Sequence, residues 1–201
     1  MKILYAIQGT GNGHLSRAME MVPALMKIAQ VDVLISGQSS QLGPPFFVRF
    51  NKKGLTFRTN SRGGISYFKT FLFSSFFTFV KEVYSLPVRD YDLVVSDFEP
   101  VSAWSSKIFG VRCIEVSHQS AILMKNSPKP SSRHRFAEWI LRNYCPSEQK
   151  IGIHFINYNQ NIFTPVIRYA VRNLEIRDDN FFLVYLPGYV DEKIIGFLST
   201  F

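Results

Sequence analysis

The sequence predicts an α/β fold in which helices flank a parallel sheet, and three observations support this prediction. Apolar runs of strand length alternate with segments whose apolar residues recur at helical spacing. A glycine-rich turn follows the first apolar run, and ionisable residues follow two later runs. Because the carboxyl ends of parallel strands meet at one edge of a sheet, we expect a ligand site at that edge.

The first two elements are a buried strand over residues 1–7 and a helix over residues 16–29. The strand is a short apolar run, and the helix has a repeating apolar face. Positions at helical spacing on this face are Ala18, Met21, Val22, Leu25 and Met26. Glycines between the two elements indicate a tight strand-to-helix turn.

Strands and helices continue to alternate along the chain. Further strands are predicted over residues 31–36, 91–96 and 111–117, with weaker short strands over 46–50 and 55–57, and a helix over 101–109. This alternation implies parallel pairing and right-handed crossovers.

Composition indicates a globular protein with a sizeable core. The 201 residues are 46% hydrophobic and only 19% charged, which excludes a disordered chain. Two cysteines, Cys113 and Cys145, make no disulfide framework, and Cys113 lies in an apolar run as expected of an inert core thiol. The chain opens with a strand rather than a signal-peptide pattern, so we expect a cytoplasmic location.

The net charge of +8 predicts an anionic partner: nucleic acid, a lipid surface or a phosphorylated substrate. Basic residues are scattered and no nucleic-acid-binding motif occurs, which disfavours nucleic acid. The histidines are not paired at ligand spacing and no D-x-D loop is found, so no metal is expected.

The glycine-rich turn ends in a histidine instead of completing a known phosphate motif. A G-x-G-x-x-G fingerprint starting at Gly9 needs glycine where the chain has His14, and no Lys-Ser or Lys-Thr pair follows for a P-loop. The turn and the helix start favour close approach of a phosphate or carboxylate. Its candidate ligand-facing residues are Gly9, Thr10, Gly11, Asn12, Gly13 and His14. The alternative is a tight turn whose histidine only caps or packs.

Two later strand ends supply further candidate residues. Asp97 and Glu99 follow the strand over 91–96, and Asp97 could orient His14 and stabilise its imidazolium. Alternatively, Asp97 caps the following helix. His118 and Gln119 follow the strand over 111–117, where His118 is either a polar wall of a ligand cleft or a strand-end residue satisfied by the backbone.

A phenylalanine-rich run over residues 67–81 suggests either membrane contact or an aromatic core helix. It is too short and interrupted to span a bilayer, which takes about 20 apolar residues. As a helix it places Phe68, Leu72, Phe76, Phe79 and Val83 on one side, with Phe71, Phe73 and Phe77 widening the apolar surface. With Arg58, Arg62, Lys69 and Lys81 nearby, it could lie in the interface of an anionic membrane.

Segments 9–14, 96–100 and 110–119 resemble the amino-terminal half of GT-B glycosyltransferases. The resemblance is closest to a bacterial and archaeal group related to the lipid-linked peptidoglycan N-acetylglucosaminyltransferase and the UDP-glycosyltransferases. It covers most of residues 1–190, including 161–168 near the domain junction. It implies a Rossmann-like acceptor-side domain over 1–165. Residues 166–201 would be a linker and the first βα unit, strand 181–187 and helix 191–198, of a nearly absent donor domain.

The resemblance also implies an activity, namely transfer of a sugar from a nucleotide-sugar donor to a hydroxyl acceptor, without a further cofactor. His14 matches the family's catalytic base and Asp97 its orienting aspartate, with the glycine loop, Glu99, His118 and Gln119 around the substrate. A lipid-linked or cell-envelope acceptor would place the protein at the inner face of the plasma membrane. Two alternatives stay open: a nucleotide-sugar 2-epimerase-like enzyme, and a non-catalytic binding subunit of a split transferase.

Overall fold

The computed structural model describes residues 1–37, 43–55, 76–128, 135–184 and 191–200. One sheet of seven parallel strands has the order β3-β2-β1-β4-β5-β6-β7. The strands are β1 (Lys2–Gln8), β2 (Gln30–Ser36), β3 (Phe50–Lys52), β4 (Leu93–Asp97), β5 (Cys113–Ser117), β6 (Gln149–Ile153) and β7 (Ile162–Phe163). The strand order reverses between β1 and β4, and this switch point is where open α/β sheets bind ligands.

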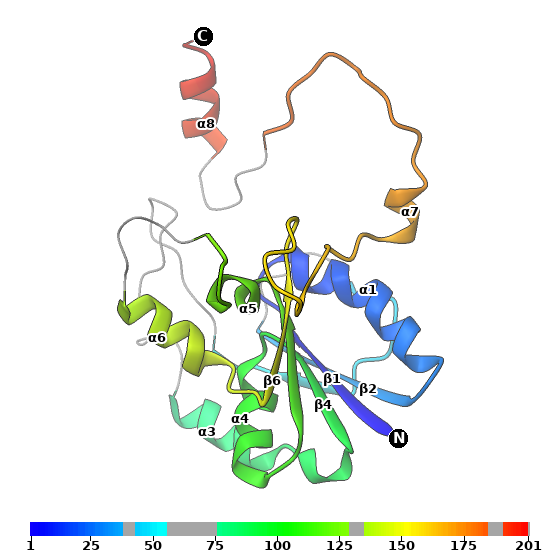
Figure 1. Ribbon diagram of the computed structural model, residues 1–201, viewed down its shortest axis with the longest axis vertical. Helices are drawn as coiled ribbons and strands as arrows, with labels where there is room; N and C mark the ends of the chain where they lie inside the picture. Colours follow the sequence, from blue (N-terminus) through cyan, green and yellow to red (C-terminus); the bar gives the residue numbers. More distant parts are fainter. Residues whose placement is uncertain (38–42, 56–75, 129–134, 185–190, 201) are drawn as a thin grey trace.

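Helices lie on both faces of the sheet, as expected for a Rossmann-like fold. They are α1 (Asn12–Met26), α3 (Phe76–Ser85), α4 (Pro100–Phe109), α5 (His118–Leu123), α6 (Arg135–Tyr144), α7 (Tyr169–Arg172) and α8 (Asp191–Leu198), with the 3-10 turn η1 (Val88–Asp90). Figure 1 shows α1 on one side of the sheet and α3 and α4 on the other. The predicted α/β class is confirmed.

The alternating side chains of β1 divide the core into two layers. Ile3, Tyr5 and Ile7 face α1, whereas Leu4 and Ala6 face α3 and α4. The first layer includes Leu15, Ala18 and Val22 of α1, and the second includes Phe79 and Val83 of α3 with Val101 and Ala103 of α4. Because β1 is buried on both faces, its sequence is a continuous apolar run rather than an alternating one.

The expected strand over 46–50 was wrong, because the short strand β3 begins only at Phe50 and ends at Lys52. The expected strand over 55–57 lies almost entirely outside the described residues and stays a prediction. The backbone after β3 leaves the sheet because Lys53 N–H and Gly54 N–H donate to the Glu82 carboxylate of α3 (2.8 and 2.9 Å). Gly54 also has φ +57, which turns the chain. Residues 56 and 57 lie outside the described residues. The predicted strands over 1–7, 31–36, 91–96 and 111–117 and the helix of 101–109 agree with the structure within two residues at each end. Helix α1 begins at Asn12 and ends at Met26, earlier at both ends than the predicted helix over 16–29.

The carboxyl-terminal segment leaves the sheet (Figure 1). Many of its described apolar side chains, such as Ile176 and Phe182, are exposed. Helix α8 forms where a helix was predicted. Residues 181–184, the described part of the predicted strand over 181–187, form no strand. A strand needs a neighbour for its backbone hydrogen bonds, and no described strand pairs with this segment. The domain division at residue 165 stays a prediction.

Candidate active site

His14 and Asp97 meet at the carboxyl edge of the sheet, at the switch point between β1 and β4. His14 lies in the first turn of α1, and Asp97 is the last residue of β4, in register with Ile7 of β1. His14 Nδ1 lies 2.7 Å from Asp97 Oδ1. The expected hydrogen-bond contact between the two side chains is therefore confirmed, although their catalytic roles stay a proposal.

A third side chain, Arg17, completes this cluster and was missed by the sequence analysis. Its Nε donates to Asp97 Oδ2 (2.9 Å) and its Nη2 to Asp97 Oδ1 (2.5 Å), which makes a bidentate pair. Arg17 follows His14 by three residues, so both side chains share one face of α1. This spacing was the available signal, but the sequence did not show which carboxylate lies opposite.

The ionic state of the cluster follows from its burial. Burial raises the pKa of Asp97, but the contacts with His14 and Arg17 outweigh burial and lower this pKa below its usual value of 3.8. An ionised carboxylate only accepts hydrogen bonds, so His14 Nδ1–H donates to Asp97 Oδ1. In neutral His14 the lone pair is then on Nε2, which can accept a proton from a ligand.

The neighbouring Tyr5 phenol is neutral. Burial, helped by the negative charge of Asp97, raises the pKa of Tyr5 well above 10. Its hydroxyl has no hydrogen-bond partner among the described residues. Asp97 and Arg17 are therefore the side chains whose charges act directly on His14 in this cluster.

Glu99, expected to contact substrate, instead caps α4, and this is a correction. Its fully buried carboxylate accepts hydrogen bonds from Val101 N–H and Ser102 N–H, both at 2.7 Å. It satisfies helix donors that would otherwise be unpaired. The alternative that Asp97 is the helix cap was wrong, because Phe98, at φ +54, turns the chain and moves the cap to Glu99. Asp97 is thus left to face His14.

The residues of the glycine loop have different surroundings. Gly9 N–H donates to Ser36 O (2.6 Å), and a Cβ on Gly9 would lie 2.7 Å from Gly37 O, so Gly9 packs the turn against β2. Gly11, at φ +93, and Gly13 have open space where a Cβ would lie. Thr10 Oγ1 accepts a hydrogen bond from Gln8 Nε2 (2.9 Å).

Asn12, the first residue of α1, is partly exposed beside these glycines. The N-cap residue of α1 is Gly11, which has no side chain that could cap the helix. The loop therefore leaves room for a ligand near the positive end of α1.

His118 and Gln119 begin α5, directly after β5, and so lie at the same edge of the sheet as Asp97. His118 Nδ1–H donates to Ile153 O (2.9 Å), which leaves Nε2 as the acceptor, and the ring stacks on His154 with centroids 5.4 Å apart. Backbone bonding thus accounts for one nitrogen of His118. Gln119 Oε1 is buried and has no hydrogen-bond partner among the described residues.

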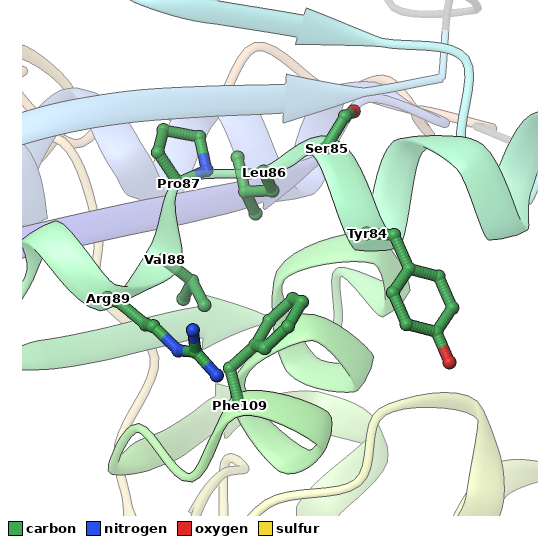
Figure 2. Close-up of a pocket in the computed structure, with 7 residues that line it drawn as sticks. All are labelled: Tyr84, Ser85, Leu86, Pro87, Val88, Arg89 and Phe109. Atoms are coloured by element: carbon green, nitrogen blue, oxygen red, sulfur yellow. The ribbon is translucent and has the colours of Figure 1, made fainter.

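A separate hollow of about 330 Å³ lies between the ends of α3 and α4 and the turn η1 (Figure 2). It is lined by Tyr84, Ser85, Leu86, Pro87, Val88, Arg89 and Phe109. The Arg89 guanidinium lies over the Phe109 ring, 4.7 Å from its centroid. Because η1 precedes β4 and Phe109 precedes β5, the hollow lies at the amino edge, opposite the His14 cluster. It is not part of the candidate active site.

No group of three or more His, Cys, Asp or Glu residues within the described ranges could hold a metal ion. In the same ranges, no helix is long and apolar enough to cross a membrane.

Fold and site together define a Rossmann-like α/β protein with a histidine, an aspartate and an arginine clustered at the switch point. The whole chain, residues 1–201, matches the model of a family described as glycosyl transferase family 1. The chain therefore belongs to this family.

Several solved structures are similar at low identity. The glycotransferase of kitacinnamycin is 10% identical, with 75% of this chain and 45% of that chain covered and a TM-score of 0.40. UGT89C1 of Arabidopsis thaliana, complexed with UDP, is 13% identical over 100% of this chain and 57% of its own, with a TM-score of 0.46. MurG of Acinetobacter baumannii is 10% identical, with 88% of this chain and 50% of that chain covered and a TM-score of 0.41. The chain spans about half the length of these structures. No curated protein sequence matches it.

Proposed function

We propose that the chain is the acceptor-side half of a glycosyltransferase that moves a sugar from a nucleotide-sugar donor to an acceptor hydroxyl. The observation that carries this proposal is the contact of His14 with the ionised Asp97 at the ligand-binding edge of the sheet. This contact directs the proton of the neutral imidazole to Nδ1 and leaves Nε2 as a base. Membership of glycosyl transferase family 1 supports the reaction class.

In the proposed reaction, His14 Nε2 takes the hydroxyl proton while the hydroxyl oxygen bonds to the anomeric carbon. The bond from that carbon to the phosphate oxygen breaks, and its electron pair leaves with the nucleoside diphosphate. Asp97 stabilises the imidazolium that forms at His14. The amino-terminal end of α1, beside Gly11 and Gly13, offers backbone N–H groups to developing negative charge.

The donor would be held mainly by a second domain. This part of the proposal rests on the resemblance, in which residues 166–201 are a linker and the first unit of a donor domain. The exposed apolar side chains of this segment, such as Ile176 and Phe182, are consistent with a surface that another domain covers. Activity of residues 1–201 without such a domain is not expected.

We further propose that the protein acts at the inner face of the plasma membrane on a lipid-linked acceptor. Within α3, Phe79 and Val83 are buried in the core, whereas Phe77 is 86% exposed and Phe76 also faces outward. The described end of the phenylalanine-rich run is thus part core and part surface, with the exposed Lys81 beside it. Residues 67–75, with Arg58 and Arg62, lie outside the described residues. The net charge of +8 favours an anionic lipid surface.

A second exposed aromatic pair supports this membrane contact. Phe136 and Trp139 on α6 stack with centroids 6.1 Å apart and are both exposed, with Arg135 and Arg142 on the same helix. An amphipathic helix with aromatic and basic side chains is suited to the membrane interface.

The transfer reaction is tested on the full-length gene product with a panel of nucleotide sugars and hydroxyl acceptors. Mass spectrometry of products and release of nucleoside diphosphate are measured. We expect His14→Gln to lower the rate by about 10²–10⁴-fold, as for loss of a general base. Asp97→Asn should also lower the rate, whereas its matched control Asp32→Asn, which removes a carboxylate paired with Arg49 at the amino edge, should not. Epimerised free nucleotide sugar as the product, or full activity of His14→Gln, would refute the proposal.

The membrane contact is tested by sedimentation with anionic and neutral vesicles at low and high salt. Binding should require anionic lipid, weaken with salt and fall in Phe77→Ser. The matched control is Phe155→Ser, because Phe155 is likewise exposed (79%) but follows β6 and belongs to neither α3 nor α6. Equal, negligible binding in every condition would eliminate the membrane contact.

A further inference from the structure

We infer that Arg17 is a positioning residue that serves as the permanent counter-ion of Asp97 and thereby keeps His14 available as a neutral base. The ionic part of this inference stands on geometry alone, and its catalytic meaning rests on the proposed function. Nothing in the family match assigns a role to this arginine.

The first step is the burial of Asp97. Its side chain is 0% exposed, so an ionised carboxylate there has lost its water and needs compensating charge and hydrogen bonds. Two side chains contact it, and they do so unequally. Arg17 bonds to both carboxylate oxygens, at 2.9 and 2.5 Å, whereas His14 bonds only to Oδ1, at 2.7 Å. Arginine stays charged throughout the physiological pH range. The carboxylate is therefore neutralised without a charge on His14.

The second step is the closeness of the two nitrogen donors. Arg17 Nη2 lies 3.2 Å from His14 Nδ1, and both point at the same Asp97 oxygen. A positive charge at that distance opposes a second positive charge on the imidazole ring. Without Arg17, the buried carboxylate would have His14 as its only charged partner, and the imidazolium would become the counter-ion. An imidazolium has no lone pair and cannot take a hydroxyl proton.

The other ionisable groups near the cluster do not replace Arg17. Tyr5 of β1 is a neutral phenol. Glu20, one turn beyond Arg17 on α1, accepts a hydrogen bond from the backbone N–H of Tyr169 (2.7 Å). From α1, β1 and β4, the charged groups in contact with His14 are thus Arg17 and Asp97.

The test measures the protonation of His14 by NMR of ¹⁵N-labelled imidazole in the chain of 201 residues near neutral pH. The His14 signals among the four histidines are assigned with His14→Gln. In Arg17→Gln the ratio of imidazolium to imidazole at His14 should rise by about tenfold or more, because a unit charge at hydrogen-bond distance is removed. Arg17→Lys should restore part of the wild-type ratio, because it keeps the charge but not the bidentate fork. Arg49→Gln, which removes an arginine from a different ion pair, should leave the ratio unchanged.

An unchanged ratio in Arg17→Gln would overturn the inference and leave Arg17 as a tie between α1 and β4. A second comparison uses Asp97→Asn, in whose background Arg17→Gln should raise the ratio less than in the wild-type background, because only the direct repulsion between Arg17 and His14 is then removed. An equal rise in both backgrounds would overturn the role of Arg17 as the counter-ion of Asp97. If circular dichroism shows that Arg17→Gln does not fold, Arg17→Met, which keeps the aliphatic stem, provides the same readout. The ratio of imidazolium to imidazole at His14 is measured without any sugar transfer. A shifted ratio, together with a full-length gene product that transfers no sugar, would refute the proposed function and leave the ionic role of Arg17 intact.

Discussion

The three glycines of the turn after β1 should respond differently to the same substitution, alanine. Gly9 is packed against β2, Gly11 has a backbone conformation that favours glycine, and Gly13 lies in the first turn of α1. The added methyl group is the same in each case. Differences in the free energy of unfolding therefore report the surroundings of each position.

Gly9→Ala should be the most destabilising of the three. Its Cβ would lie 2.7 Å from Gly37 O, 2.9 Å from Ile35 Cγ2 and 3.0 Å from Ser36 O. Two of these atoms are backbone and cannot turn aside, so the turn must move and lengthen the 2.6 Å hydrogen bond from Gly9 N–H to Ser36 O. Overpacking costs about 1–3 kcal/mol and a weakened hydrogen bond about 1 kcal/mol, which together predict a loss of about 2–4 kcal/mol.

The other two substitutions are the matched controls. Gly11→Ala meets nothing within 4 Å but requires φ +93 with ψ 159, a backbone region essentially restricted to glycine, which costs other residues about 1–3 kcal/mol. Gly13→Ala also meets nothing within 4 Å and, in a helix, should stabilise the protein by up to about 1 kcal/mol. The expected order of stability is Gly13→Ala, wild type, Gly11→Ala and Gly9→Ala.

Urea denaturation followed by circular dichroism measures these free energies, provided that the m-value is the same in all four proteins. Equal stability of Gly9→Ala and Gly13→Ala would refute the close packing of the turn against β2. The NMR signal of His14 offers a second readout, because movement of the turn also moves His14 relative to Asp97.

Three further predictions concern buried carboxylates. Glu99→Gln keeps one acceptor for the start of α4 and should lower the free energy of unfolding by about 1 kcal/mol in the same denaturation assay. Glu99→Ala removes both acceptors and should lower it by about 2–4 kcal/mol. Equal losses in the two variants would contradict the capping role. The contacts of Asp97 lower its pKa despite burial, so it stabilises the fold above its unfolded value of 3.8, and this stabilisation is lost as pH falls through the lower folded value. The advantage of wild type over Asp97→Asn should therefore shrink below about pH 4 in acid unfolding, and a constant difference would argue against an ionised Asp97. Lys150→Met leaves the buried Glu115 without its ion-pair partner and should lower the free energy of unfolding by about 3–5 kcal/mol. If the unpaired charge is the cause, adding Glu115→Gln should recover most of this loss.

The sequence alone predicted the features that depend on local pattern and on the rules of parallel sheets. The apolar run of β1, the glycine turn and the helical spacing of α1 are visible within 26 residues of the start. The parallel order then brings the residues after β1 and β4 to one edge, which is why the contact of His14 with Asp97 could be predicted although the two lie 83 positions apart.

Other features depend on which distant segment each residue meets, and only the tertiary structure decided them. Asp97 and Glu99 are both carboxylates after the same strand, but the positive φ of Phe98 turns one toward His14 and the other into the start of α4. Arg17 is separated by 80 positions from the carboxylate that it neutralises.

Burial along α3 was decided in the same way. Among the described residues, Phe79 packs in the core beside α4, whereas Phe77 lies on the side of α3 that faces away from this core. Periodicity predicts that a helix has an apolar face, but the partner that covers this face comes from elsewhere in the chain. For the same reason, the charges beside His14 depend on the fold, which brings the side chains of α1 to the carboxylate at the end of β4.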